Sequence, residues 1–349
     1  MLRALGLGDT LTGVPALRAL RRARPDHVLV LAGPPGPGAL LQARGVVDRV
    51  LPVEGVGSLD EGALGAALHE HPDVLPPGRC VDLAVNLHGR GPQSVRALRR
   101  LLDERGAPGS RLLGHRCAAA GLDDGPAWEV DLHEVDRWRR LVAGVGGRSG
   151  AEDLVLPAVE GSCRAPGLVP AAPPEAVVLH PGAASGARRW PAGRWAAVAA
   201  ALLGGGTDVV LTGGGAETAL TADVAGRVRR QGTDAPEAGS GALVDLAGRC
   251  DLEQLAGVVG SARALVCGDT GVAHLATALR TPSVLLFGPV PPGAWGPAVD
   301  HDRHRVLWPA PSPSYRGDPH ADGLDPVLAR TSASDVLAAL RSLPGPPTS

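Results

Sequence analysis

Apolar runs of strand length alternate with stretches of helical periodicity through the first half of the chain. Apolar residues recur at helical spacing from Leu11 to Leu20 and again within 94–104. Short apolar runs that predict buried strands stand at residues 28–33, 49–53 and 82–89. Strands that alternate with helices are typical of βαβ units, so the pattern predicts a parallel sheet in this half.

The same alternation begins again after 158–175, a segment rich in proline and small residues. Apolar runs in the second half predict strands at 176–182, 208–215, 243–248, 264–267 and 283–288. Helical patterns stand at 195–203, 217–230, 252–262 and 332–343. We therefore predict an α/β chain of two doubly wound, Rossmann-like domains that face a central cleft.

The pattern divides the chain into four parts. We place an N-terminal domain at 1–160, a linker at 161–175 and a C-terminal domain at 176–331. The remaining residues, 332–349, are predicted to form a closing helix and a tail.

The amino-acid composition limits the classes of protein to which the chain can belong. The net charge is −2, so no overall charge favours binding to nucleic acid. All 34 basic residues are arginines and isoleucine is absent, which is typical of a GC-rich genome rather than of selection at each position. Five cysteines without a C-x-x-C pair are typical of a reduced, cytosolic protein.

No apolar run approaches the roughly 20 residues that are needed to cross a bilayer. We therefore expect a cytoplasmic protein. The arginines within 18–24 leave open a peripheral association with the inner face of a membrane, although a solvated helix end accounts for them more simply.

Polar residues gather where the predicted strand 264–267 ends and a helix begins. Asp269, Thr270 and Gly271 occupy this junction, and His274 follows one turn later. The first turn of a helix offers unpaired N–H groups and the positive end of the helix dipole, which together favour a phosphate. The alternative is that Asp269 or Thr270 only caps the helix and that His274 is a packed core residue.

The segment 269–297, DTGVAHLATALRTPSVLLFGPVPPGAWGP, closely resembles glycosyltransferase family 9, the heptosyltransferase family. The resemblance continues, in the order of the family, at 6–20, 179–202 and 209–218. It implies the GT-B fold, in which two Rossmann-like domains hold the active site between them. The first domain would be on the acceptor side and the second would bind the nucleotide sugar.

The resemblance also implies an activity. The chain would be an inverting glycosyltransferase that moves a sugar, such as heptose, from a nucleotide-diphosphate sugar to a hydroxyl of a cell-envelope glycan or lipid-linked acceptor. No cofactor and no metal are expected. Two alternatives stay open, a sugar-nucleotide epimerase on the same fold and a nucleotide-sugar-binding protein that does not catalyse transfer.

Site roles follow from the resemblance position by position. Asp9, the acid of the N-terminal G-D turn, is implied as the general base that deprotonates the acceptor hydroxyl, although it could also cap the first helix. Only residues 1–6 precede this turn, so either the first strand is short or the natural start lies upstream. A short strand would hold Asp9 less firmly.

The implied donor pocket lies in the second half. Ser185 belongs to the H-P-G loop that contacts the diphosphate, and Arg188 matches a basic residue with the same role, often lysine in relatives. Glu217 matches an acid that binds the ribose, although a first-turn acid of the following helix is equally natural. The pocket is completed by Asp269, Thr270, Gly271 and His274.

Histidines and acids also gather in VDHDRH at 299–304 and in GDPH at 317–320. The first has spacing that suits a metal, but partner ligands are not clustered in the sequence nearby, so we interpret it as a solvated charged loop. We interpret the second as a turn near the donor.

Overall fold

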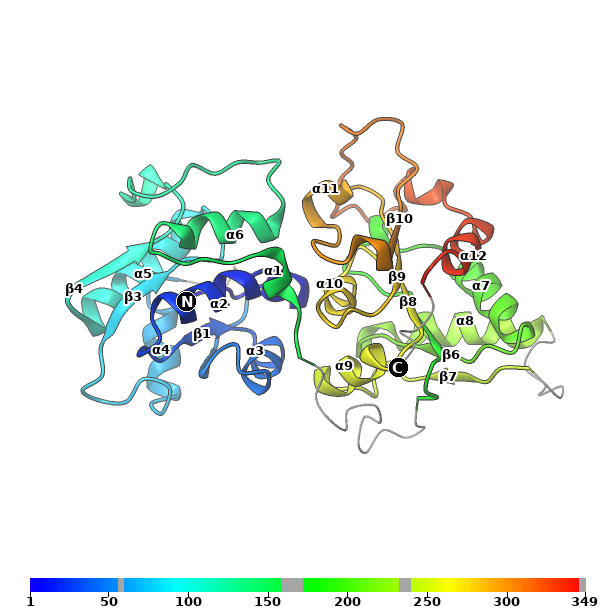
Figure 1. Ribbon diagram of the computed structural model, residues 1–349, viewed down its shortest axis with the longest axis horizontal. Coiled ribbons are helices and arrows are strands. Elements are labelled where there is room, and N and C mark those ends of the chain that lie inside the picture. Colours follow the sequence, from blue (N-terminus) through cyan, green and yellow to red (C-terminus); the bar gives the residue numbers. More distant parts are fainter. Residues whose placement is uncertain (56–59, 158–171, 232–239, 345–349) are drawn as a thin grey trace. The chain divides into compact units, whose positions relative to one another are not determined.

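The computed structural model describes residues 1–55, 60–157, 172–231 and 240–344, and it divides into two compact units (Figure 1). Unit 1 is Met1–Leu154 and unit 2 is Val155–Ser349. Most of the predicted linker 161–175 lies outside the described residues. Each unit contains parallel strands and helices, so the predicted α/β class is confirmed in both.

Unit 2 is built on one parallel sheet. Its strands are β5 (Val177–His180), β6 (Val209–Leu211), β7 (Leu243–Asp245), β8 (Ala264–Gly268), β9 (Ser283–Leu286) and β10 (His304–Leu307). They lie in the order β10-β9-β8-β5-β6-β7. The first strand of the unit is therefore central and the chain winds outward in both directions, as in a doubly wound fold. The sequence pattern did not predict β10.

Helices cover both faces of this sheet (Figure 1). They are α7 (Ala192–Gly204), α8 (Thr218–Arg230), α9 (Leu252–Gly260), α10 (Gly271–Ala278), α11 (Pro292–Trp295) and α12 (Ala333–Arg341). The helices α7, α8 and α12 pack together on one face, and α9 packs with α10 on the other. Trp190 and Trp195 meet edge to face in the core, with ring centroids 5.0 Å apart. Short 3₁₀ turns lie at Gly186–Arg188, Gly215–Glu217, His301–Arg303 and Leu328–Arg330.

Unit 1 contains two pairs of parallel strands. These are β1 (Val30–Gly33) with β2 (Arg49–Pro52), and β3 (Val81–Val85) with β4 (Gly106–Leu113). The helices are α1 (Leu7–Thr12), α2 (Val14–Ala23), α3 (Pro35–Ala43), α4 (Ala63–Glu70), α5 (Pro92–Arg105) and α6 (Glu134–Ala143). 3₁₀ turns lie at Ala118–Ala120 and Ala151–Leu154.

The helical spacing from Leu11 to Leu20 belongs to two helices, α1 and α2, that are separated at Gly13. A Cβ atom at Gly13 would lie 3.2 Å from Cδ of Arg3. The break in the helix therefore lies where the chain passes closely over a buried arginine.

The two strand pairs of unit 1 are joined by a single residue. Leu2 forms parallel bridges to Ala32 in β1 and to Asn86 directly after β3. The order across unit 1 is therefore β2-β1-Leu2-β3-β4, so the chain winds outward from a central strand that is reduced to Leu2. Among the described residues, no helix is both long and apolar enough to span a membrane.

Candidate functional site

In unit 2 the strand order changes direction between β5 and β8, because the chain winds to one side of β5 first and then to the other. We call this place the switch point. These strands are neighbours, and His180 at the end of β5 pairs with Cys267 near the end of β8. In doubly wound sheets, ligands bind outside the carboxyl ends of the strands at this point because the two connections leave toward opposite faces. The loop 181–188 leaves β5 here, and the helix α10 follows β8.

Arg188 and Asp269 form an ion pair at the switch point. Nη1 of Arg188 lies 3.3 Å from Oδ2 of Asp269, and the side chains are 25% and 8% exposed. Nε of Arg188 is buried and has no hydrogen-bond partner within the described part of the chain. Because buried polar groups in proteins are usually paired, this guanidinium retains a donor for a ligand.

Thr270 is the N-cap residue of α10, with φ −141° and ψ 169°, but its side chain makes no cap hydrogen bond. The capping interpretation is therefore wrong for Thr270. Its buried hydroxyl has no partner in the described residues beyond an interaction with the Cys267 thiol. Burial raises the pKa of that thiol, which is consequently neutral and no nucleophile. The first turn of α10 thus retains the N–H groups and the hydroxyl that an anion would accept.

His274 lies in the buried part of α10 and is 7% exposed. Its ring packs edge to face against Trp295 of α11, with the centroids 5.9 Å apart. This contact favours the core interpretation of His274, and its contact with a donor stays a prediction.

Glu217 reaches back over the H-P-G loop. A Cβ atom at Gly182 would lie 1.8 Å from Oε1 of Glu217, so any larger residue would force this carboxylate to move. Oε2 accepts a hydrogen bond of 2.7 Å from the backbone N–H of Gly214, so Glu217 does stabilise the start of its own helical segment. This bond occupies one of the two carboxylate oxygens.

His180 lies beside this carboxylate, with Nε2 3.9 Å from Oε2 of Glu217. Its Nδ1 is 3.0 Å from Oγ1 of Thr212. Burial lowers the pKa of His180, and the negative charge of Glu217 opposes that effect more weakly. A cavity of about 200 Å³ opens next to it at the carboxyl ends of β5, β6 and β7, and is lined by His180, Thr212, Gly213, Gly214, Leu246, Cys250, Asp251, Leu252 and Leu255.

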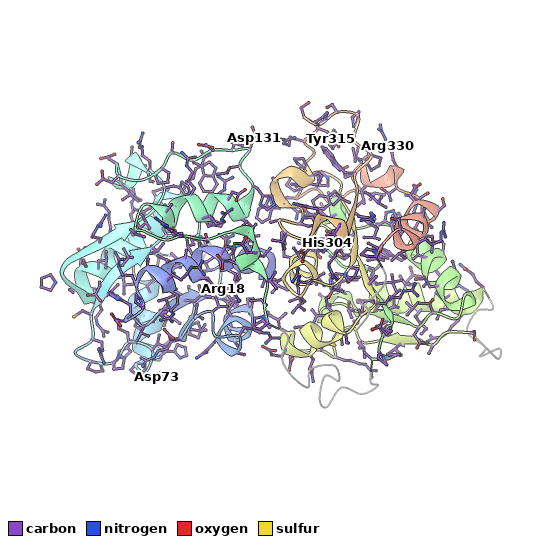
Figure 2. The ribbon with its side chains drawn as sticks, viewed as in Figure 1. Arg18, Asp73, Asp131, His304, Tyr315 and Arg330 are labelled. Atoms are coloured by element: carbon purple, nitrogen blue, oxygen red, sulfur yellow. The ribbon has the colours of Figure 1, made fainter. Side chains whose placement is uncertain are left out.

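Ser185 connects the H-P-G loop to a later segment of unit 2. Its hydroxyl donates to the carbonyl of Pro319 at 2.7 Å, and the N–H of Ala187 donates to Ala321 at 2.9 Å. The GDPH segment forms a turn in which Asp318 accepts from the N–H of His320, as the sequence predicts. Nearby, Tyr315, labelled in Figure 2, donates to Asp325. A donor contact of Ser185 stays a prediction.

Asp9 lies in unit 1, in the first turn of α1, seven residues after the central residue Leu2. Its side chain is 31% exposed, and Oδ1 is 3.6 Å from Nη2 of Arg3. Arg3 itself is only 1% exposed. Its Nε donates to the carbonyl of Asp9 and its Nη1 to that of Leu87, so the arginine fixes the turn that carries the carboxylate.

The sequence analysis missed the residues around Asp9. Besides Arg3, these are Glu134, whose Oε1 is 3.1 Å from Nη2 of Arg3, and Trp138, whose ring lies under the guanidinium at 4.6 Å. The available signal was a single charged residue inside the apolar stretch LRALG, because a charge there is buried and needs a partner. Its partner, 131 residues away, had no comparable signal.

The VDHDRH segment has internal partners. Asp300 pairs with Arg280 at 2.6 and 2.9 Å, and Nδ1 of His304, labelled in Figure 2, lies 2.8 Å from the hydroxyl of Ser283. In the described ranges, no group of three or more His, Cys, Asp or Glu side chains is arranged to hold a metal ion.

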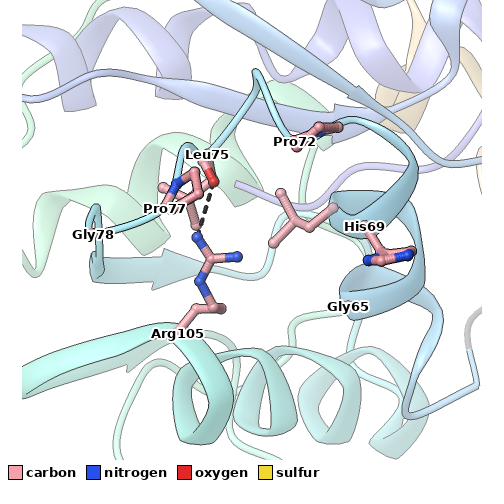
Figure 3. Close-up of a pocket in the computed structure, with 8 residues that line it drawn as sticks. Gly65, His69, Pro72, Leu75, Pro77, Gly78 and Arg105 are labelled. Atoms are coloured by element: carbon pink, nitrogen blue, oxygen red, sulfur yellow. Dashed lines mark hydrogen bonds between the residues drawn. The ribbon is translucent and has the colours of Figure 1, made fainter.

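A separate cavity of about 390 Å³ in unit 1 contains none of the predicted site residues (Figure 3). It lies between Gly65 and Arg105, and Nη2 of Arg105 donates to the carbonyl of Leu75 at 2.9 Å.

Comparison with known proteins identifies the family of this chain. The model of glycosyltransferase family 9 (heptosyltransferase) matches residues 127–316, which is more than half of the chain. Lipopolysaccharide heptosyltransferase 2 of Salmonella typhimurium is 29% identical over 164 residues, which cover 47% of this chain and 45% of that protein. Lipooligosaccharide heptosyltransferase 2 of Haemophilus influenzae is 31% identical over 121 residues, or 34% and 33% of the two chains. The matches thus span less than half the length of these curated relatives.

Two solved structures resemble the whole chain. ADP-heptose LPS heptosyltransferase II of E. coli gives a TM-score of 0.73 at 22% identity, and covers 98% of this chain and 96% of its own. The E. coli heptosyltransferase WaaC with ADP gives 0.64 at 20% identity, with coverage of 97% and 98%. The predicted GT-B fold is confirmed by this likeness.

Proposed function

Because the chain belongs to glycosyltransferase family 9, the heptosyltransferase family, we propose that it transfers a heptose from ADP-heptose to a hydroxyl of a cell-envelope glycan such as lipopolysaccharide. The names of the similar proteins motivate the choice of sugar, nucleotide and acceptor. The alternatives of an epimerase and of a binding protein are outcomes of the experiments below.

The donor would bind at the switch point of unit 2. The observation that carries this proposal is the pair of unsatisfied polar groups, Nε of Arg188 and the hydroxyl of Thr270, beside the N-terminus of α10. Leaving buried polar groups unpaired costs about 1–3 kcal/mol each, a cost that a bound diphosphate would offset. Glu217 and the cavity beside His180 are suited to the nucleoside, since a carboxylate accepts hydrogen bonds from ribose hydroxyls.

We assign the role of general base to Asp9. The acceptor oxygen would form a bond to the anomeric carbon while the bond from that carbon to the diphosphate oxygen breaks, which inverts the anomeric configuration. Asp9 takes the acceptor's proton, and the leaving nucleoside diphosphate takes the bonding electron pair. Arg188 and the α10 N-terminus stabilise the charge that develops on the leaving group, so we expect transfer without a metal.

The first experiment measures thermal stability with ADP, GDP and UDP, with and without magnesium. A ligand at about 100 times its dissociation constant stabilises a fold by about 2.7 kcal/mol. We expect stabilisation by ADP that needs no magnesium and that Arg188→Ala abolishes. The matched control is Arg227→Ala, which removes an exposed arginine that pairs with Asp223 on α8. The absence of stabilisation by any diphosphate would contradict a donor site.

The second experiment tests Asp9. The Asp9→Ala variant should keep the affinity for ADP but lose transfer from ADP-heptose by about 100-fold or more, because it lacks the base. Release of an epimerised nucleotide sugar by the wild type, without an acceptor, would favour an epimerase. Binding without any turnover would favour a binding protein.

A further inference from the structure

The guanidinium of Arg3 lies between two carboxylates of unit 1. Its Nη2 is 3.6 Å from Oδ1 of Asp9 and 3.1 Å from Oε1 of Glu134. The side chains of Arg3 and Glu134 are 1% and 10% exposed, whereas that of Asp9 is 31% exposed. A buried positive charge is thus shared between a buried acid and the partly exposed acid to which we assign the base role.

Glu134 is held in place by three donors. Besides Arg3, the indole N–H of Trp138 donates to Oε1 at 2.9 Å, and Nε of Arg137 donates to Oε2 at 2.9 Å. Arg137 is in turn fixed by the carbonyls of Glu129 and Leu132 and lies over Trp128 at 3.9 Å. The Glu134 carboxylate is therefore fixed in orientation between two guanidinium groups.

Other titratable and charged groups of unit 1 lie beside Arg3 or on the helices that pack against α1. His88 lies beside Arg3, but burial and the charge of Arg3 lower the pKa of His88 to about 4, so it is neutral at ordinary pH. The α2 arginines have partners elsewhere, since Arg18 and Arg22 bind Asp153 and Arg21 binds Asp48. The helix α3 contains no charged residue, and Arg44 follows it. Arg3 and Glu134 are therefore the charged groups through which α6 is connected to Asp9.

We propose that Glu134 is a positioning residue that sets the protonation of Asp9 through their shared partner, Arg3. The inference rests on the proposed transfer reaction, in which Asp9 is the base. The Glu134 carboxylate, 3.1 Å from Nη2 of Arg3, partly neutralises the guanidinium, so Arg3 orients Asp9 without stabilising its carboxylate strongly. Asp9 then retains enough basicity to take a proton. Without that negative charge, the carboxylate of Asp9 would be stabilised further and would be a weaker base.

Two substitutions should move the protonation of Asp9 in opposite directions. Glu134→Gln removes a negative charge and keeps one acceptor oxygen, which can serve Trp138 and Arg3 or Arg137 but not both sides. The acidic limb of kcat/KM against pH should therefore shift down by about 0.5 pH unit. Arg137→Gln removes the positive charge on the other side of Glu134, so the limb should shift up by a similar amount. A purely structural role would lower the rate at all pH values without moving the limb.

Matched controls lie on the same helix. Asp136→Asn and Arg140→Gln remove the same charges from exposed positions of α6 that pair with Arg139 and Glu129. Both controls should leave the acidic limb unchanged. A limb that stays in place in Glu134→Gln and in Arg137→Gln would overturn the proposal. If Glu134→Gln does not fold, Arg137→Gln remains as the test: an upward shift of its acidic limb would support the proposal, and an unchanged or lowered limb would overturn it.

A readout that needs no turnover separates this inference from the transfer reaction. The carboxyl carbon of Asp9 can be titrated by NMR in ¹³C-aspartate-labelled protein, with Asp9→Asn used for assignment. A wild type without transfer activity would contradict the proposed function, yet opposite titration shifts in the two variants would still support control by Glu134. Unshifted Asp9 titrations would overturn the inference even in an active enzyme.

Discussion

Some residues of unit 2 have buried polar groups that make no strong hydrogen bond to the rest of the described structure. Nε of Arg188 and the Thr270 hydroxyl are buried without strong partners among the described residues, while Gly182 leaves room for the Glu217 carboxylate. Each of these positions follows the carboxyl end of a strand, where the backbone leaves the sheet. Side chains at such positions are available to a ligand, because the core lies behind them.

Substitution of Gly182 tests this close approach. In Gly182→Ala the new methyl group would lie 1.8 Å from Oε1 of Glu217, so the carboxylate must move away from the loop. We expect about a tenfold or greater loss of ADP affinity, measured by calorimetry, because two donor-binding elements separate. In the control Gly193→Ala, the nearest atom is 3.8 Å from the added Cβ atom, and affinity should be unchanged. Equal affinities in both variants would remove Glu217 from the donor site.

A buried histidine predicts how stability depends on pH. Burial lowers the pKa of His304 to about 4, whereas an unfolded histidine titrates near 6.5. The unfolded chain therefore binds a proton between these values and the folded chain does not, so stability is complete above pH 6.5 and falls below it. His304 alone should contribute a loss of about 1.4 kcal/mol per pH unit in that window.

Urea unfolding at pH 7.5 and pH 5 measures this contribution. His304→Asn keeps an amide beside the Ser283 hydroxyl but cannot titrate, so its stability should fall less between the two pH values than that of the wild type. The exposed His301 provides the control, as His301→Asn should retain the wild-type dependence. An identical pH dependence in His304→Asn would contradict the assignment.

At the scale of elements, the sequence predicted the strands and helices whose apolar or helical pattern is not interrupted by charged residues, proline or glycine. The runs before Asp269 and after Thr281 became β8 and β9, and the alternation of strands and helices gave the winding. β10 was missed because charged residues flank and enter it, with Arg305 inside the strand. The α3 helix was missed because proline and glycine fill its first turn, where proline is tolerated although it resembles a turn signal.

The sheet of unit 1 depends at its centre on one residue, Leu2, so its substitution tests the fold directly. Leu2 is fully buried and bridges both neighbouring strands. Leu2→Ala should lower the free energy of unfolding by about 3 kcal/mol, since it leaves a cavity in the middle of the sheet. In the control Val28→Ala, the side chain is 55% exposed before substitution, so the change should stay within about 0.5 kcal/mol. Chemical denaturation compares the two, and similar losses would contradict the central role of Leu2.

At the scale of the whole molecule, the chain repeats one winding in two units. The motif residues Asp9, Arg188 and Asp269 could be predicted because each stands in a short recognisable stretch at the end of a strand. The network of Arg3 and Glu134 could not, because it depends on two residues that only the tertiary fold brings together. Local sequence therefore located the candidate site residues but not the buried groups that contact Asp9.

Hydrogen exchange on the full chain can locate the donor site. ADP should slow amide exchange in 180–188 and in 269–275, because these segments contain the groups assigned to the diphosphate. The bridges of Leu2 to Ala32 and Asn86 provide an internal reference in unit 1, where we expect no slowing. In Arg188→Ala the effect of ADP should disappear. Protection confined to unit 1 would contradict a donor site in unit 2.

The ion pair between Arg188 and Asp269 means that an anion can bind Arg188 fully only by replacing the Asp269 carboxylate. A phosphate that approaches Arg188 meets a guanidinium that is already neutralised by a carboxylate 3.3 Å away. The incoming anion must therefore displace one negative charge with another, and a singly charged ligand gains little from the exchange. Only a group with more charge and more acceptor oxygens than a carboxylate gains clearly, so this pair should select phosphate groups over singly charged carboxylate ligands.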